Sequence, residues 1–223
     1  MEKLIKTLRL LIPLCFIPLT VLLGATVVDE RRYGLISLCV AILVVWLFLL
    51  GFEKETASSR RTVLVAVLIA LSVVGRMIPL FKPITAITVL SAIYLGAESG
   101  FTVGALSALI SNFYFGQGPW TPFQMLAWGL IGLFAAWLSR PLRKSRTLLL
   151  IYGLLSAILY SALMDVWTVL WASQTITSSI YLAALLTALP HTILYAVSNV
   201  IFLALLAKPF GEKLERVKIK YGV

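Results

Sequence analysis

The chain contains 223 residues, of which 61% are hydrophobic and only 13% are charged, and its mean hydropathy is +1.00. A soluble domain carries about a quarter charged residues, so nineteen Lys and Arg with nine Asp and Glu are too few to cover a water-exposed surface. These values exclude a cytosolic enzyme, a secreted disulfide scaffold and a disordered tail, and they indicate a polytopic membrane protein.

The apolar runs predict eight transmembrane helices. In chain order they cover Leu10–Val28, Tyr33–Phe52, Thr62–Gly75, Ile84–Ala97, two spans within the uncharged stretch Ser99–Ser139, Thr147–Trp171 and Ser178–Ala207. Pro79 discourages continuation of the third helix, and the breaker cluster Gly116–Pro119 divides the long uncharged stretch. The first run is long enough to span and lacks a small-residue cleavage site, so we interpret it as a membrane helix and not as a cleaved signal.

Charged residues divide between the two sides of this predicted bundle. With the N-terminus inside, fifteen of the nineteen Lys and Arg residues fall in inner segments, including the polar linker 53–61, the basic block 140–146 and the tail. The four in outer loops are Arg31, Arg32, Arg76 and Lys82. This asymmetry predicts that both chain ends are cytoplasmic, and it explains the net charge of +10 without nucleic-acid binding.

Small residues recur at four-residue spacing on two predicted helices. Ala66 and Ala70 form one such face, and Gly100, Gly104 and Ala108 form another. Close helix contacts in membranes use small residues, and ordinary packing within the bundle is the simplest interpretation of each face.

The motifs of several enzyme classes are missing from the sequence. No phosphate-binding G-x-x-x-x-G-K-[ST] loop occurs, and the single histidine, His191, belongs to no H-E-x-x-H motif. Cys15 and Cys39 lie in apolar runs without metal-binding spacing. Asp165 is the one acid deep in a span, where a carboxylate is costly. Asp165 is therefore a candidate member of a polar site; pairing with Arg76 is its structural explanation, and acid–base catalysis with His191 in an intramembrane enzyme is a less favoured hypothesis.

Polar and aromatic residues gather near the expected outer ends of the last four helices. The segment Asn112–Gln124 is rich in amides and rings, and three helical faces repeat such residues at one-turn spacing. These faces are Trp120, Gln124 and Trp128; Ser161, Asp165 and Thr168; and Thr187, His191, Tyr195 and Asn199. Their convergence predicts an aromatic cleft with a few hydrogen-bonding groups, which is typical of a small-molecule site.

These features also have structural explanations. Trp120, Trp167 and Trp171 are equally expected in an interfacial aromatic belt. The last polar face is compatible with interhelical hydrogen bonding alone. His191 directly follows Pro190 and is placed to satisfy a carbonyl group freed by a proline kink.

From Arg61 onward the sequence resembles the substrate-binding S component of an energy-coupling factor (ECF) vitamin transporter. The residues that carry the resemblance are Val65–Ala70, Gly75–Pro79, Gly100–Ala108 and, most specifically, Phe115–Gly132. The resemblance covers about 160 of the 223 residues. It leaves the first two helices outside the family pattern.

The resemblance implies an all-α membrane bundle with a six-helix core at residues 59–210. Residues 1–58 would add two N-terminal transmembrane helices and a cytoplasmic linker, and residues 211–223 a basic cytoplasmic tail. In such a family, the alanine face, here Ala66 and Ala70, docks on a transmembrane coupling subunit that carries two cytoplasmic ABC-type ATPases. The chain would be a transporter subunit of the cell membrane, with no catalytic residue, metal or cofactor of its own.

The resemblance also implies a substrate site at the outer side, formed by loops and by the outer parts of the last three helices. The residues expected to bind substrate are Arg76, Asn112, Tyr114, Gln117, Trp120, Gln124, Trp128, Asp165, Trp171, His191 and Tyr195. The resemblance leans toward cobalamin, whose apolar ring and amide groups suit such a cavity. Another vitamin, a nucleobase-like nutrient, or an assembly subunit without ligand are the alternatives.

Overall fold

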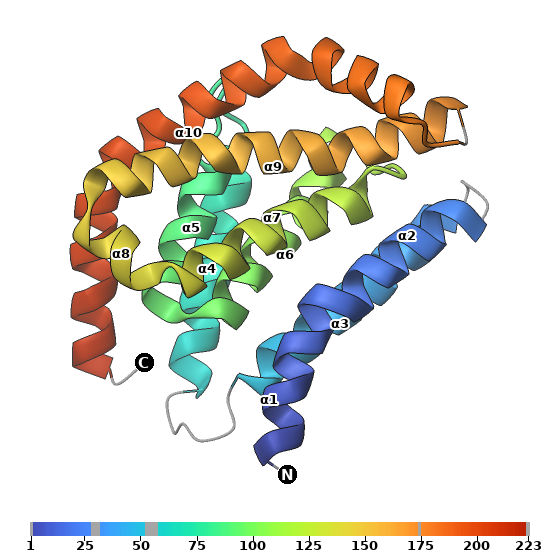
Figure 1. The fold of residues 1–223 in the computed structure, drawn as a ribbon. Coiled ribbons are helices and arrows are strands. Elements are labelled where there is room, and N and C mark those ends of the chain that lie inside the picture. Colours follow the sequence, from blue (N-terminus) through green and yellow to red (C-terminus); the bar gives the residue numbers. More distant parts are fainter. Residues whose placement is uncertain (1, 28–31, 52–57, 174, 222–223) are drawn as a thin grey trace.

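The computed structural model describes residues 2–27, 32–51, 58–173 and 175–221, and every regular element in these ranges is helical (Figure 1). The helices are α1 Glu2–Leu11, α2 Ile17–Val27, α3 Tyr33–Leu50, α4 Ser58–Gly75, α5 Ile84–Leu95, α6 Ala97–Phe115, α7 Thr121–Trp137, α8 Ser139–Lys144, α9 Arg146–Ser173 and α10 Ser178–Tyr221. A π-helical turn, Ile12–Phe16, joins α1 to α2. The predicted all-α membrane bundle is confirmed.

Each predicted span coincides with a helical segment, and within the described residues four segments have the length and hydropathy to cross a membrane on their own. They are Lys3–Val27, Tyr33–Leu50, Arg146–Ser173 and Ser178–Val217. Helices α5 and α7 are apolar but shorter, and nearly all residues of α5 are buried. Neighbouring helices therefore surround α5, so that it does not need to span the full thickness of the lipid by itself.

The structure differs from the predicted boundaries where charged residues begin. Helix α4 starts at Ser58, a separate short helix α8 forms in the basic block, and α10 continues through Pro209 as far as Tyr221. Hydropathy marks where apolar residues end, whereas backbone hydrogen bonding continues beyond the bilayer. The charged turn 29–32 and the linker 53–61 lie partly outside the described residues.

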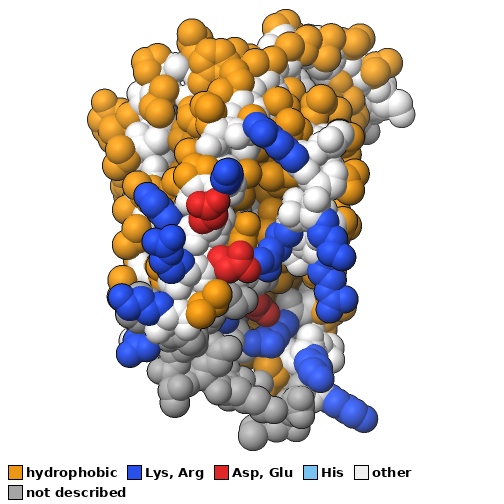
Figure 2. Space-filling view, turned by 90° about the vertical axis from the view of Figure 1, so that its left-hand side faces the viewer, with side chains coloured by type: hydrophobic (Ala, Val, Ile, Leu, Met, Phe, Trp, Pro, Cys, Tyr) orange, Lys and Arg blue, Asp and Glu red, His pale blue; other side chains and the backbone are white. Residues whose placement is uncertain are grey.

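The two ends of the bundle differ in character. Both chain ends lie toward one end, which we call the terminal end, and the α6–α7 loop and the start of α10 lie toward the other, the loop end (Figure 1). On the side formed by α8 and the second half of α10, Lys and Arg side chains gather mostly in the lower half, where both chain ends also lie (Figure 2). The charge asymmetry of the sequence thus corresponds to a spatial asymmetry.

Glycines bring α5, α6 and α7 into close contact at the centre of the core. A Cβ atom at Gly104 would lie 2.6 Å from the carbonyl carbon of Trp128, and one at Gly132 would lie 2.5 Å from the backbone of Gly100. Ala108, the third member of the predicted face, is also fully buried. The face that includes Gly100 and Gly104 therefore serves internal packing.

The N-terminal hairpin, formed by α1 to α3, is held to the core by Glu98 near the terminal end. The Glu98 carboxylate lies 3.4 Å from Arg9 Nε of α1 and 3.8 Å from Arg61 Nη2 of α4. Arg9 Nε also donates to the Leu50 carbonyl group at 3.0 Å, and Arg61 Nη2 to that of Leu95 at 2.7 Å. One partly buried carboxylate thus joins the hairpin to two core helices.

Replacing Glu98 with glutamine should lower the free energy of unfolding by about 1 kcal/mol, or roughly 3 °C in Tm, because two arginines lose their counter-charge. Thermal unfolding of the purified chain in detergent measures this change. Glu215→Gln is the matched control, since the Arg143–Glu215 pair is more exposed and should contribute less. Equal effects of the two substitutions would show that Glu98 has no special role in holding the hairpin.

Candidate functional site

The central feature of the loop end is a buried arginine. Arg76 directly follows α4, and its Nη1 donates to Asn112 Oδ1 at 3.0 Å and to the Ser111 hydroxyl group, both on α6. The rings of Phe115 and Trp128 each lie 5.0 Å from the guanidinium carbon. These cation–π contacts stabilise the charge in a place that water reaches poorly. Helices α4, α6 and α7 therefore meet at Arg76.

Amide side chains extend this arrangement from α6 through α7 to α9. Asn112 Nδ2 donates to Thr121 Oγ1 and to Gln124 Oε1, both at 2.9 Å. Gln124 Nε2 in turn donates to the Tyr160 hydroxyl group at 3.1 Å. The chain of donors and acceptors fixes the orientation of each amide, which a rigid recognition site requires.

Stacked rings complete the arrangement on α9 and α10. Trp128 and Tyr160 have centroids 4.7 Å apart, and Tyr160 stacks on Tyr195 at 5.0 Å with planes 6° apart. The ring of His191 lies 5.2 Å from Tyr195 and is exposed. We call the set Arg76, Ser111, Asn112, Thr121, Gln124, Trp128, Tyr160 and Tyr195 the loop-end cluster.

Two buried donors of the loop-end cluster have no hydrogen-bond partner among the described residues. They are Arg76 Nε and the indole Nε1 of Trp128. Arg76 also has no ion pair with a carboxylate in the described part of the chain. Buried polar groups are normally satisfied, so donors left free beside a stack of rings suit a flat ligand with acceptor atoms.

Lys82 lies beside the cluster in the loop between α4 and α5. Its backbone N–H donates to Ser198 Oγ at 2.8 Å, and its ammonium group lies 5.2 Å from the centre of the Phe115 ring. Partial burial, followed by the positive charge of Arg76, lowers the pKa of Lys82. Two cations therefore lie close to the Phe115 ring, and the site favours acceptor-rich or anionic groups.

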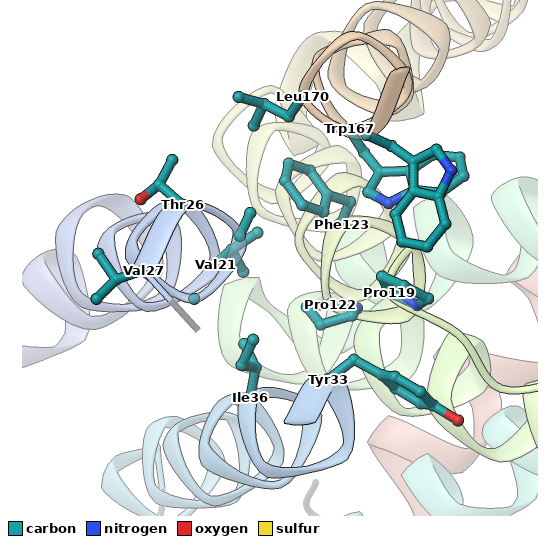
Figure 3. Close-up of a pocket in the computed structure, with 13 residues that line it drawn as sticks. Val21, Thr26, Val27, Tyr33, Ile36, Pro119, Pro122, Phe123, Trp167 and Leu170 are labelled. Carbon is teal, nitrogen blue, oxygen red and sulfur yellow. The ribbon is translucent and has the colours of Figure 1, made fainter. Parts of the chain in front are cut away.

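Trp120 and Trp171 belong to a second aromatic group outside the loop-end cluster. Both rings contact Trp167, with centroids 5.7 and 6.0 Å away. Trp167 and Trp171 line a cleft of about 540 Å³ between the N-terminal hairpin and the first turn of α7 (Figure 3). Pro122 and Phe123 line its α7 side, whereas Thr121 and Gln124 of the same turn belong to the cluster. The expected face of Trp120, Gln124 and Trp128 is thus divided.

Three other expected residues make contacts of a structural kind. The Tyr114 side chain is 70% exposed and contacts only the edge of Phe115 among the ring pairs of the described residues. Gln117 donates to the Leu109 carbonyl group and accepts from Thr121, which fixes the α6–α7 loop. Asp165 is buried and accepts a hydrogen bond from Ser161 at 3.3 Å. The ion pairs of the described residues do not include Arg76 with Asp165; Arg76 donates to Ser111 and Asn112 instead.

Several residues in or beside the loop-end cluster were not among those expected to bind substrate. Ser111, Thr121 and Tyr160 all hydrogen-bond to expected residues, and Phe115 and Lys82 contribute the second aromatic face and the second charge. The sequence offered one signal for Ser111, Thr121 and Tyr160: each lies within four residues of a polar residue on one of the expected faces or in the Asn112–Gln124 segment. Hydroxyl groups are too common in membrane helices for that proximity to identify them.

A multi-pass helical bundle with a buried polar and aromatic cluster at one end is the architecture of a membrane protein that binds a small solute. A family model described as ECF-type riboflavin transporter, S component, matches residues 56–216. The match covers more than half of the chain, and the chain belongs to this family. Neither a comparison with curated proteins nor one with solved structures gives a match.

Membership defines the class of activity. The chain is the substrate-binding subunit of a transporter and not an enzyme, so the predicted S component is confirmed and the hypothesis of acid–base catalysis by Asp165 and His191 falls. S components in general work with a transmembrane coupling subunit and ATPases. The expectation of cobalamin receives no support from the match, because the family is of the riboflavin type.

Proposed function

We propose that this chain captures riboflavin, or a closely related flavin, in the loop-end cluster and delivers it to an ECF-type importer. The family match supports the vitamin class. The observation that carries the proposal is the buried Arg76 guanidinium with its free Nε, held beside the Trp128, Tyr160 and Tyr195 rings. A flavin offers a flat ring for stacking and carbonyl and ring-nitrogen acceptors for the arginine.

The proposal includes roles for the cluster residues. Arg76 Nε and the indole Nε1 of Trp128 donate to acceptors of the flavin ring, Asn112 and Gln124 hold its polar edge, and the ring of Tyr195 lies beside it. His191, exposed beside Tyr195, and Lys82 lie where the polar side chain of the vitamin would project. Tyr114, Gln117, Trp120, Asp165 and Trp171 support loops and neighbouring rings in this proposal.

The proposed orientation places the loop end outside the cell and both chain ends in the cytoplasm of a cell-membrane protein. Fifteen of nineteen Lys and Arg residues then face the cytoplasm, as the positive-inside rule requires. We propose a division into an N-terminal hairpin and linker, a six-helix core and a basic tail; the family match, which covers residues 56–216, supports the first of the two boundaries.

The proposed coupling surface is the outward face of α4. Ala66 and Ala70 are both exposed there, beside the exposed side chains of Val63, Val67 and Val74. A helix face of small and β-branched residues permits close approach of a partner helix in the membrane. We propose that the transmembrane coupling subunit docks on this face and that two cytoplasmic ABC-type ATPases supply the energy.

Ala70→Trp should reduce vitamin uptake by about tenfold or more while the affinity of the isolated subunit changes by less than about twofold, because the indole separates the two helix surfaces without reaching the loop-end cluster. Uptake by cells and calorimetry of the purified subunit measure the two quantities. Val74→Trp, on the same exposed face but one turn nearer the loop end, maps the extent of the surface. Loss of binding in Ala70→Trp would refute the docking role.

The function is tested by uptake of labelled riboflavin into vesicles that contain the chain with or without a coupling subunit and its ATPases. Uptake is expected only with the complete set and with ATP. Unlabelled riboflavin should abolish the signal, whereas cobalamin in the same excess should leave it unchanged. Competition by cobalamin and not by riboflavin would show that the transported substrate is a corrinoid and not a flavin. Uptake without ATPases would refute the importer.

A further inference from the structure

A second cleft lies near the terminal end, away from the loop-end cluster. It has a volume of about 350 Å³ and lies between α5, α8, α9 and the second half of α10. Its apolar lining includes the buried side chains of Leu90 and Leu149. Its charged lining comes from three different elements: Arg143 of α8, Arg146 of α9, and Lys208 of α10 with two glutamates. We call it the basic cleft.

The charges of the basic cleft are only partly neutralised. Arg143 pairs with Glu215 at 2.5 Å, and its guanidinium carbon lies 4.8 Å from the centre of the Tyr94 ring. Arg146 donates to the Ala204 carbonyl group at 3.3 Å. Neither Arg146 nor Lys208 has an ion pair within the described ranges. After Arg143 and Glu215 cancel, two cations face the single remaining carboxylate, Glu212.

The basic cleft lies where the charged and apolar surfaces of the protein meet. Leu205, less than one helical turn before Lys208, is 64% exposed, and Leu148, two residues after Arg146, is 45% exposed. On the same side of the molecule, basic side chains border a mainly hydrophobic upper surface (Figure 2). An occupant of the basic cleft is therefore in contact with the hydrocarbon boundary of the membrane.

We propose that the basic cleft binds the headgroup of an anionic phospholipid. The phosphate group lies between Arg146 and Lys208, and the first acyl carbons leave along Leu205 and the apolar lining. The uncompensated positive charge of the cleft complements the single negative charge of a phosphodiester. An acidic peptide of a partner would satisfy the cations equally but would leave the adjacent apolar surface without a role. In the proposed orientation, the basic cleft faces the anionic cytoplasmic leaflet.

Native mass spectrometry of the full chain in detergent tests this site with two added lipids, dioleoyl phosphatidylglycerol and dioleoyl phosphatidylcholine. The chain should retain one phosphatidylglycerol in preference to phosphatidylcholine. The variant with Arg146→Gln and Lys208→Gln should raise the apparent Kd for phosphatidylglycerol by about tenfold. The matched control carries Arg140→Gln and Lys144→Gln, which remove the same charge from exposed positions outside the cleft lining. This control should change the apparent Kd for phosphatidylglycerol by about twofold at most at physiological salt.

The proposal is overturned by equal retention of the two lipids, or by equal losses in the two double variants, which would show attraction to net charge alone. It is also overturned if inorganic phosphate at millimolar concentration displaces the lipid, because the site would then recognise a free anion. All four substitutions lie at exposed positions, and an unchanged Tm verifies the fold of each variant. The result does not depend on which vitamin the loop-end cluster binds.

Discussion

Replacing Arg76 with methionine is expected to lower the affinity for the vitamin by about 100-fold, because the ligand loses charge-assisted hydrogen bonds that no other residue of the loop-end cluster supplies. The ligand-free protein should keep its stability within a few degrees of Tm. A buried cation without a carboxylate partner carries a desolvation penalty, and an apolar side chain of similar length removes that penalty. Calorimetry and thermal unfolding, with and without vitamin, measure both effects.

Arg76→Lys is the informative companion to this variant. Lysine keeps the positive charge but lacks the planar fork that bonds to Ser111 and Asn112 while leaving Nε free. An intermediate loss of about tenfold is expected. If Arg76→Met unfolds the ligand-free protein while Arg76→Lys binds normally, Arg76 is a structural residue and the proposed ligand contact is wrong.

Replacing Gly104 with leucine is expected to destabilise the chain by at least about 3 kcal/mol, because the added side chain must enter the α6–α7 contact at the backbone of Trp128. A backbone carbonyl group cannot rotate away as a flexible side chain does, so the two helices must separate. Asn112 on α6 and Gln124 on α7 then lose their hydrogen bond, and vitamin binding should disappear with the fold. Thermal unfolding and vitamin titration in detergent check the two results.

Gly34→Leu is the control, because a Cβ atom at Gly34 in α3 would have no neighbour within 4 Å. The Tm of this control should stay close to that of the unmodified chain. A similar loss of Tm in both variants would mean that the close contact of α6 with α7 does not determine stability.

The membrane architecture was predictable because lipid permits few backbone solutions. Every apolar run had to become a helix, and Pro79 and the Gly116–Pro119 cluster marked where helices end. The continuation of α10 through Pro209 was not predictable, since its last residues are charged and make no hydropathy signal. Likewise, the short helix α8 was not predictable, because it forms by local backbone hydrogen bonding in a basic segment whose composition is typical of a loop.

The loop-end cluster was only partly predictable, for a geometric reason. Helical spacing correctly groups Gln124 with Trp128, but it also groups Trp120 with them, although the first turn of α7 divides its contacts between the cluster and the Trp167 group. Which hydroxyl groups complete the network depends on how α4, α6 and α9 meet, and no pattern within one helix contains that information. Asp165 shows the same limit: its cost in a span was evident, but its partner was not Arg76.

The central claim is that the isolated chain binds a flavin through the loop-end cluster. Calorimetric titration of the purified full chain with riboflavin, cobalamin and cobinamide tests it most directly, with Arg76→Met titrated in parallel. We expect one riboflavin site with a Kd on the order of micromolar or tighter, no heat from either corrinoid, and a much weaker site in the variant. Failure of riboflavin to bind, or undiminished binding by Arg76→Met, would contradict the claim.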